Sequence, residues 1–303
     1  MRGIARPEHS THSLCRSLVI MGVAQDAQPG DKAMSMPPSP HVHYDVIAPR
    51  YDTQPYRAKT VDPQLLAFLE QRAPLQGLAL LDVGCGTGNQ LVANRGVVPS
   101  AQLVGVDRSV GMLRQARYKA PDITWVQADG ALLPFGAPCF DFVTCQYALH
   151  HVHDKAAMLE AVFRVLRPGG RFVLSNICPQ EMADWLYYQY FPESRARDFQ
   201  AFWTPDVVVR TMEAVGFVAV VVERQHLRYE QDLHVWLDTV RLRETCSQLL
   251  TISDAAYEAG VQRLERELAE RHAPLVRVDH VCLVTIRGEK RAGTAEPGRA
   301  RAK

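Results

Sequence analysis

The chain has 303 residues, of which 47% are hydrophobic, and its 34 lysine and arginine residues nearly balance its 33 aspartate and glutamate residues. This length accommodates one large or two small domains with a substantial core, and the apolar content excludes an intrinsically disordered protein. The formal net charge of +1 provides no field that would attract nucleic acid or a membrane surface. No apolar run reaches the roughly 18 residues that a membrane span requires.

The seven cysteines are scattered and form no Cys-x-x-Cys pair. This usage argues against a secreted disulfide framework and against a zinc knuckle. It favours a reducing compartment, and we therefore predict a cytoplasmic protein that holds no metal.

Composition divides the chain into three parts. Residues 1–40 contain five prolines and no sustained hydrophobic period, which predicts a disordered extension. Residues 41–288 form the predicted folded domain. Residues 289–303 combine basic residues with Gly, Ala and Pro, which predicts a disordered basic tail.

Apolar runs alternate with helical periods along the folded domain. Strands are predicted at 78–84, 102–107, 123–127, 140–145, 171–175, 217–222 and 280–286. Capping residues predict helix starts at Asp62, Ser109, Asp154 and Thr204. Strands that alternate with helices form βαβ units, so we expect an α/β fold with a doubly wound, mostly parallel sheet.

Two segments interrupt this alternation and are predicted to be helical cap insertions, at about 178–203 and 232–274. The first is rich in aromatic residues, which either roof a pocket for an apolar acceptor or fill the core of the cap. The second carries apolar residues at helical spacing. It either extends the cap or forms a homodimer contact, and the sequence leaves both open.

A glycine-rich loop follows the first predicted strand, in the stretch Asp82-Val-Gly-Cys-Gly-Thr-Gly88. Glycine lets the turn be tight and lets a ligand lie against the backbone. The loop stands at the carboxyl edge of a parallel sheet, where such folds bind ligands. Residue 89 is Asn and no Lys follows, so neither the dinucleotide fingerprint nor the P-loop is matched.

Acidic residues end the next two strands. Asp107 ends the second and has the position of a carboxylate that accepts hydrogen bonds from a ribose diol. Asp129 ends the third and can accept from the amino group of an adenine. Taken alone, each aspartate could also be an ordinary capping or turn residue. The glycine loop, Asp107 and Asp129 at three consecutive strand ends are a more specific signal together.

These residues resemble a known family. The glycine loop, Gly105-Val-Asp107, Ala128-Asp-Gly130, the stretch 141–152 and Arg164 to Phe172 are similar, in order, to motifs of the class I S-adenosylmethionine-dependent methyltransferases. The similar branch is that of ubiquinone and menaquinone biosynthesis. The resemblance covers residues 44 to about 220. It implies a Rossmann-like sheet of seven strands whose last strand is antiparallel.

The resemblance also implies roles for individual residues. Gly84, Cys85, Gly86 and Gly88 would pass under the methionine moiety of S-adenosylmethionine, and Asp82 would position the loop and the amino group. Asp107 would bind the ribose, and Asp129 the adenine. The remaining cofactor-binding candidates are Tyr44, Tyr51, Arg108, Met112, Gly130 and Gln146.

The resemblance implies methyl transfer to an O-, C- or N-nucleophile of a small organic acceptor by in-line displacement. Alignment of the reactants supplies much of the acceleration in such a reaction. His150 and His151 follow the fourth strand and are the candidates for a catalytic base, with a purely structural role as the alternative. A non-catalytic cofactor-binding partner protein and an RNA or DNA methyltransferase are the alternative functions. Gln146-Tyr-Ala-Leu149 lacks the Asn/Asp-Pro-Pro-aromatic motif of amino-methylating nucleic-acid enzymes.

Overall fold

A computed structural model describes residues 44–54, 57–71, 77–270 and 275–292. The predicted disordered extension at 1–40 and most of the predicted tail lie outside these residues. Glu289 and Lys290, which the sequence analysis assigned to the tail, are the last two residues of a strand. Within the described residues, no helix combines the length and apolarity needed to cross a bilayer.

Seven strands form one sheet in the order β3-β2-β1-β4-β5-β7-β6. The strands are β1 (Ala79–Val83), β2 (Gln102–Asp107), β3 (Thr124–Gln127), β4 (Phe140–Gln146), β5 (Leu166–Ile177), β6 (Phe217–Asp232) and β7 (Val276–Lys290). Strands β1 to β5 pair in parallel, and β7 is antiparallel to both β5 and β6. The predicted sheet and its antiparallel last strand are therefore confirmed.

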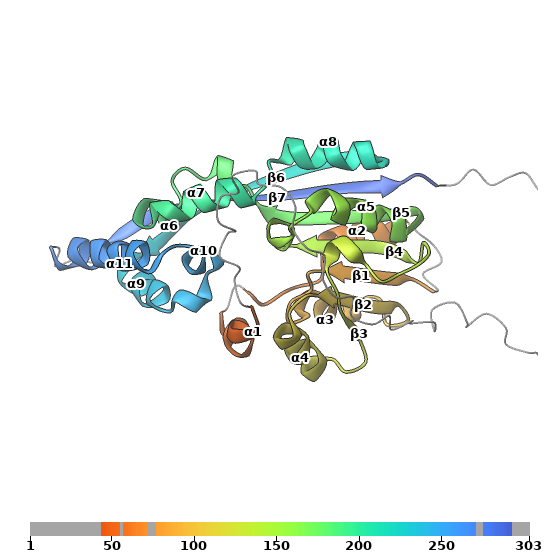
Figure 1. Cartoon of the computed structure of the whole chain (residues 1–303), viewed down its shortest axis with the longest axis horizontal. Coiled ribbons are helices and arrows are strands. Elements are labelled where there is room, and N and C mark those ends of the chain that lie inside the picture. The colour runs from red at the N-terminus through yellow and green to blue at the C-terminus, as the bar shows by residue number, and fades with distance from the viewer. Residues whose placement is uncertain (1–43, 55–56, 72–76, 271–274, 293–303) are drawn as a thin grey trace, which may run out of the picture. The chain divides into compact units, whose positions relative to one another are not determined.

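Eleven α-helices lie in the described part of the chain, and short 3-10 turns connect several of them (Figure 1). The helices are α1 (Tyr44–Ile47), α2 (Pro63–Glu70), α3 (Asn89–Arg95), α4 (Val110–Lys119), α5 (Lys155–Val165), α6 (Leu186–Tyr190), α7 (Pro192–Ala201), α8 (Pro205–Val215), α9 (Leu233–Arg241), α10 (Ser247–Leu250) and α11 (Asp254–Ala269). The 3-10 turns are η1 (Ala48–Thr53), η3 (Gly130–Leu132), η4 (Leu149–His151), η5 (Pro179–Glu181) and η6 (Arg243–Thr245). Asp62, Ser109, Asp154 and Thr204 accept hydrogen bonds from backbone N–H groups of α2, α4, α5 and α8, which confirms the predicted caps.

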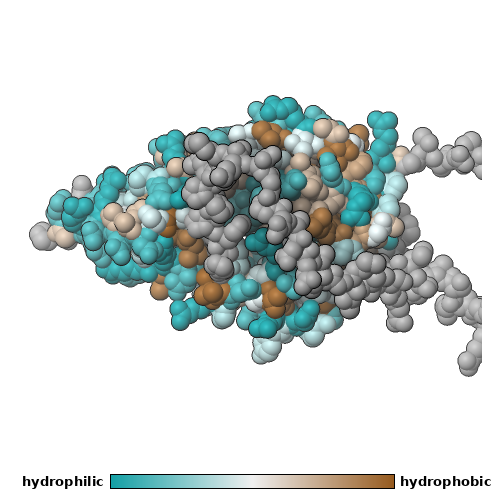
Figure 2. Space-filling view, in the orientation of Figure 1, coloured by the Kyte–Doolittle hydropathy of each residue, from teal (hydrophilic) through white to brown (hydrophobic). Residues whose placement is uncertain are grey.

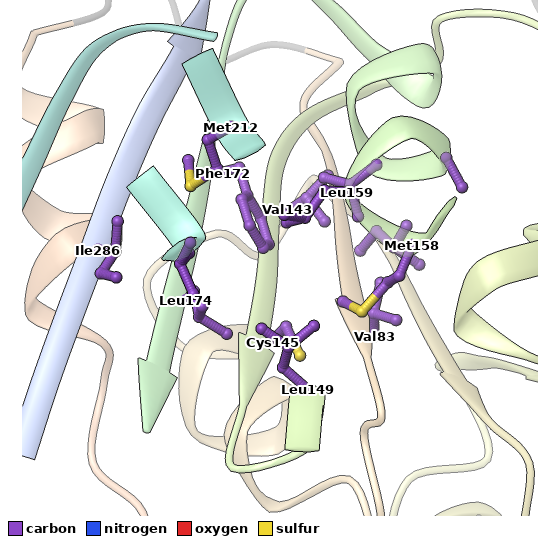
Figure 3. Packing of buried hydrophobic residues seen from close by; sticks show 14 of the residues in the cluster. Val83, Val143, Cys145, Leu149, Met158, Leu159, Phe172, Leu174, Met212 and Ile286 are labelled. Carbon is purple, nitrogen blue, oxygen red and sulfur yellow. The ribbon is translucent and has the colours of Figure 1, made fainter. Parts of the chain in front are cut away.

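The two faces of the sheet bury separate apolar clusters. Helices α5 and α8 cover one face, where Met158 and Met212 pack on strand residues such as Val143 and Phe172 (Figure 3). Helices α2, α3 and α4 cover the other face. Side chains alternate along a strand, so a strand buried on both faces reads as a continuous apolar run. This covering explains the burial of every residue of β1.

Strands β6 and β7 are longer than predicted. The sequence analysis ended the sixth strand at Val222, whereas β6 continues to Asp232 and pairs with β7 along that length. The added residues are mostly polar and exposed. The backbone N–H and C=O groups of these residues bond to the neighbouring strand, and their side chains do not need to be buried. No apolar alternation therefore marks this part of the hairpin.

The second half of the hairpin leads into the cap. Helices α9, α10 and α11 lie between β6 and β7 in sequence and pack with α6 and α7 around one apolar cluster (Figure 1). The ring of Trp236 has its centroid 5.3 Å from those of Tyr187 and Tyr190. Tyr187, Tyr190 and Phe191 of the first insertion are thus part of the core of the cap. Trp185 and Tyr188 belong instead to the cluster on the α5 and α8 face of the sheet. In Figure 2 the outer surface of the cap is largely hydrophilic, as amphipathic helices require.

Candidate functional site

The glycine loop connects β1 to α3 at the carboxyl edge of the sheet. The backbone N–H groups of Gly84 and Cys85 both donate to the carbonyl of Val106, at 2.8 and 3.0 Å. The N–H of Gly86 donates to Oδ2 of Asp107 at 2.8 Å. The folded backbone therefore joins the glycine loop to the end of β2, as the constellation predicted.

Two glycines of this loop have different surroundings. Both have a positive φ, +53° at Gly86 and +80° at Gly88. A Cβ at Gly88 would overlap the ring of Trp125, whereas a Cβ at Gly86 would meet no heavy atom within 4 Å. Position 88 therefore requires glycine because of packing inside the protein. The side of Gly86 that lacks a Cβ faces open space, which a ligand can approach closely.

The two predicted acidic residues end neighbouring strands. Asp107 accepts the N–H of Ser109 through Oδ1 at 2.8 Å, in addition to the N–H of Gly86. Asp129 accepts the N–H of Ala131 at 2.9 Å and so caps η3. Burial raises the pKa of Asp107, while backbone hydrogen bonds oppose that shift. Each carboxylate oxygen retains acceptor capacity for a hydroxyl or amino group.

The other candidates near β2 and β3 differ in accessibility. Gly130 opens η3 directly after Asp129. Arg108 follows β2, and its positive charge lowers the pKa of His151. Met112 is only 2% exposed within α4, so its side chain faces the protein interior rather than an open cleft.

Buried polar side chains follow β1 and β4 on the other side of the glycine loop. Asp82 is 3% exposed and accepts the hydroxyl of Thr144 at 2.8 Å. Burial raises its pKa to about 7, against the influence of the Lys59 ammonium group. Gln146 accepts from Nζ of Lys59 at 3.2 Å and donates to Asp62 at 3.2 Å. The structure thus adds Lys59 and Asp62 to the predicted residues.

A cavity of about 590 Å³ opens beside these groups. Its wall combines the segment before α2 with the ends of β4 and β5 and the middle of β6 and β7. The lining residues are Ala58, Lys59, Thr60, Val61, Asp62, Pro63, Gln64, Gln90, Gln146, Tyr147, Ser175, Glu223, Arg224, Gln225, Leu283, Val284 and Thr285. Tyr147 has a φ of +53°, a strained conformation for a residue with a side chain.

An N-terminal segment bridges the two sides of the site. Asp45 accepts from the hydroxyl of Ser109 and the N–H of Gly111, both at 2.6 Å. Asp52 accepts the hydroxyl of Thr87 at 2.7 Å and pairs with Lys119 at 2.7 Å. The segment is therefore fastened to the glycine loop and to α4.

The two predicted tyrosines belong to this segment. The ring of Tyr44 lies edge-on to that of Tyr51, with centroids 6.4 Å apart. The guanidinium of Arg57 donates to the Tyr51 hydroxyl at 2.6 Å and lies 4.1 Å above its ring. Burial raises the pKa of both tyrosines, so both are neutral hydrogen-bonding groups at neutral pH.

The histidine pair, His150 and His151, contacts this segment through His151. Nε2 of His151 is 2.6 Å from the Tyr44 hydroxyl. His150 stacks on Phe202 with ring centroids 4.0 Å apart, and its Nδ1 is 3.4 Å from the side-chain amide of Asn176. Burial lowers the pKa of His150 well below its usual value and that of His151 to about 4. Both rings are neutral at neutral pH, and neither lines the cavity.

Sequence reasoning missed several residues that the fold brings to the site. Lys59, Arg57 and Asp52 precede the first predicted strand in a stretch without hydrophobic period, and no local pattern distinguishes them from a solvated linker. Thr285 reaches the cavity only because β7 lies beside β5.

Known proteins share this architecture. Residues 81–174 match a family model described as a methyltransferase domain. The demethylmenaquinone methyltransferase of Lactococcus lactis is 36% identical over 124 residues, which cover 39% of this chain and 46% of that protein. The 2-phytyl-1,4-naphtoquinone methyltransferase of Thermosynechococcus vestitus is 32% identical over 166 residues, which cover 47% of this chain and 73% of that protein. The match thus spans about half the length of the first relative.

A solved structure shows the same fold. The phosphoethanolamine N-methyltransferase 2 of Haemonchus contortus, in complex with S-adenosyl-L-methionine, has a TM-score of 0.52 at 19% identity. The superposition covers 82% of this chain and 57% of that chain.

Proposed function

This chain belongs to the class I S-adenosylmethionine-dependent methyltransferases, and we propose that it methylates a small organic acceptor. The observation that carries the proposal is the junction of Gly86 and Asp107. It places a loop open to a ligand and a carboxylate at the same sheet edge. Of the predicted site residues, Gln146 lines the cavity of about 590 Å³. S-adenosylmethionine supplies an electrophilic methyl group to such a site.

We assign the nucleoside half of the cofactor to the ends of β2 and β3. Asp107 would accept the ribose hydroxyls and Asp129 the adenine amino group, with Arg108 and Gly130 around them. The free space at Gly86 supports the fit of the cofactor as a whole, because a side chain there would occupy volume that the ligand needs.

The methionine half would lie toward β4. The Lys59 ammonium suits a carboxylate, and the Asp82 carboxyl, hydrogen-bonded to Thr144, suits an ammonium group. Gln146 holds Lys59 in place. The N-terminal segment with Tyr44 and Tyr51 would exclude water from the bound cofactor.

The cavity beside Gln146 and Tyr147 is the proposed acceptor site. Ser175, Thr285, Gln225 and Glu223 line it with hydrogen-bonding groups, which favours an acceptor with several polar functions. The lining residues would orient the nucleophile, and this alignment would be the main contribution of the protein to the rate of methyl transfer. His150 and His151 lie outside this wall, so we propose a positioning role for them instead of proton transfer.

The proposal retains the cytoplasmic location expected from the cysteine usage. The acceptor is proposed to be a small molecule and not a nucleic acid. The homodimer contact considered for residues 232–271 stays a prediction.

Calorimetric titration with S-adenosylmethionine, S-adenosylhomocysteine and NADH tests the cofactor. We expect micromolar binding of the two sulfur compounds and none of NADH. Release of S-adenosylhomocysteine in the presence of phenols, quinols and hydroxy acids then tests turnover. Absence of binding by both sulfur compounds would refute the proposed function, and binding without turnover on any acceptor would favour a non-catalytic partner protein.

A lysine pair tests the methionine subsite. Lys59→Gln should weaken S-adenosylmethionine binding, because it removes the charge facing the carboxylate. Lys155→Gln is the matched control, since Lys155 is partly buried but donates to the carbonyl of Val152 outside the cavity. Equal affinities of the two variants would remove Lys59 from the site.

A further inference from the structure

Three adjacent strands carry metal-binding side chains in one row. Cys282 on β7 is paired in register with His226 on β6. On the other side, the N–H of Cys178, directly after β5, donates to the carbonyl of Cys282 at 2.9 Å. Residues that pair across strands project to the same face of a sheet. The two thiols and the imidazole therefore share one face.

A carboxylate from η5 reaches over this row. Oε1 of Glu181 is 3.6 Å from Sγ of Cys178, and Oε2 is 3.6 Å from Sγ of Cys282. Oε2 is also 3.5 Å from Nε2 of His226. The ligand atoms of Cys178, Glu181 and Cys282 all lie within 4.8 Å of one another.

These separations fit a tetrahedral metal centre. With metal–sulfur bonds of about 2.3 Å and metal–oxygen bonds of about 2.1 Å, sulfur and oxygen ligands lie about 3.6 Å apart. Each Cys–Glu distance has this value, but Cys178 is near Oε1 and Cys282 near Oε2, so the carboxylate must turn to bring one oxygen to a centre between the two thiols. Nε2 of the half-exposed His226 lies next to Oε2 of Glu181 and is the candidate for the fourth ligand.

The neighbouring residues hold these ligands in suitable orientations. Nδ1 of His226 is 3.1 Å from Nε2 of His280, which leaves Nε2 of His226 for a metal. Arg224 donates to Oε1 of Glu181 at 2.9 Å and so helps to fix the position of the carboxylate. Protein metal sites commonly have such outer partners on both histidine and carboxylate ligands.

The cluster is separate from the proposed methyl-transfer site. Cys282 belongs to the apolar cluster on the α5 and α8 face, while Leu283 and Thr285 line the acceptor cavity. The two cysteines are 2% and 0% exposed, and access from solvent is through Glu181 and His226. No step of the proposed reaction uses any of these groups.

We propose that Cys178, Glu181, Cys282 and His226 bind one Zn²⁺ ion. Two thiolates, an imidazole and a carboxylate form a set of borderline-soft ligands that suits zinc better than magnesium or calcium. All four tetrahedral positions are taken by protein, which is the pattern of a structural site. The ion ties η5 and the end of β5 to the base of the β6–β7 hairpin. This proposal departs from our sequence-based expectation, because the ligands are too far apart in sequence to form a recognisable motif.

Cobalt spectroscopy of the full-length chain tests the site. The reduced protein, freed of metal by a chelator, is titrated with Co²⁺ and then with Zn²⁺. We expect a thiolate-to-cobalt charge-transfer band, the visible bands of tetrahedral cobalt, and loss of both with one equivalent of zinc. Absence of the charge-transfer band would overturn the proposal.

Variants locate the ion. Cys178→Ser and Cys282→Ser should each weaken zinc binding by about 100-fold or more, since loss of an outer-shell partner alone costs about 10- to 100-fold. Glu181→Gln and His226→Gln alter half-exposed side chains and should also weaken binding while the fold is kept. Cys139 directly precedes β4, at the edge of the sheet opposite to the cluster. Cys139→Ser should therefore bind zinc as tightly as the wild type does. A charge-transfer band unchanged in both Cys178→Ser and Cys282→Ser would place the metal elsewhere and refute the proposal.

Discussion

Tyr44 and His151 are 107 positions apart in the sequence, yet a hydrogen bond of 2.6 Å joins the phenol oxygen to Nε2. Their rings also meet edge-on, with centroids 5.1 Å apart. The contact fastens the N-terminal segment to the turn that follows β4. It uses the ring nitrogen that a catalytic base would offer to its substrate.

A double-mutant cycle distinguishes the two roles of His151. If the contact is a latch, Tyr44→Phe and His151→Ala each weaken cofactor binding, and the double variant is no weaker than the more affected single variant. We expect a coupling energy of about 1 kcal/mol, the usual net contribution of one hydrogen bond. The measurement is calorimetric affinity for S-adenosylmethionine. A large loss of turnover in His151→Ala with unchanged affinity would instead identify a base.

Removal of the Asp107 carboxylate should weaken cofactor binding strongly. Hydrogen bonds to charged groups contribute about 1.5–3 kcal/mol each, so loss of two of them predicts at least about a 100-fold lower affinity in Asp107→Ala. Asp122→Ala is the control, because that aspartate pairs with Arg95 on the surface. Calorimetry on both variants checks the prediction, and equal affinities would exclude Asp107 as a ligand to the ribose.

A pair of glycine substitutions separates backbone strain from ligand contact. Gly77 and Gly86 both have a positive φ, and an added Cβ meets no heavy atom within 4 Å at either position. Gly77→Ala and Gly86→Ala should therefore lose similar stability, about 1–2 kcal/mol for the left-handed conformation. Only Gly86→Ala should also weaken cofactor binding, by about 10- to 100-fold for a methyl group forced into an occupied site.

Denaturant titrations with and without S-adenosylmethionine measure both quantities. If Gly86→Ala bound the cofactor as well as Gly77→Ala does, the open side of the loop would not be part of the binding site.

The pH dependence of stability should report the buried carboxyl of Asp82. Burial raises its pKa from the ordinary 3.8 to about 7, so between these values the folded state binds more protons than the unfolded state. The contribution of Asp82 to the free energy of unfolding is therefore complete below pH 3.8 and is lost as the pH rises through about 7. In Asp82→Asn the side chain stays neutral, and the decline between pH 3.8 and about pH 7 should become smaller.

Chemical denaturation of both proteins across this range provides the measurement. Asp122→Asn, at an exposed position, is expected to retain the wild-type decline. A slope unchanged by Asp82→Asn would show that the carboxyl is already ionised in the folded protein.

Local chemistry in the sequence predicted the strands and helix caps around the glycine loop well. Continuous apolar runs marked β1 and β4, because both are buried on two faces. Gly216, with a φ of +116°, ends α8 in the left-handed conformation that glycine favours after a helix. Asp107 and Asp129 follow strands that the sequence identified, so their common edge followed from the parallel topology.

The residues that line the cavity could not be predicted in the same way. Glu223 and Gln225 lie on β6 beyond Val222, where pairing with β7 continues without any apolar pattern. Lys59 meets Gln146 across 87 positions, and only the completed fold creates that contact. Long-range contacts between polar residues carry no periodic signal along the chain.

The connection between β6 and β7 has a consequence for how such a chain diversifies. Asp232 and Val276 are partners in register, and the N–H of Leu233 donates to the carbonyl of Leu275 at 2.9 Å. The chain thus leaves the hairpin and returns to it at adjacent points, and 43 residue positions separate these two in sequence. A segment of different length can be exchanged at this junction without shifting the register of the strands. Selection can in this way exchange the helices of the cap while the glycine loop and the strand ends beside it are inherited unchanged.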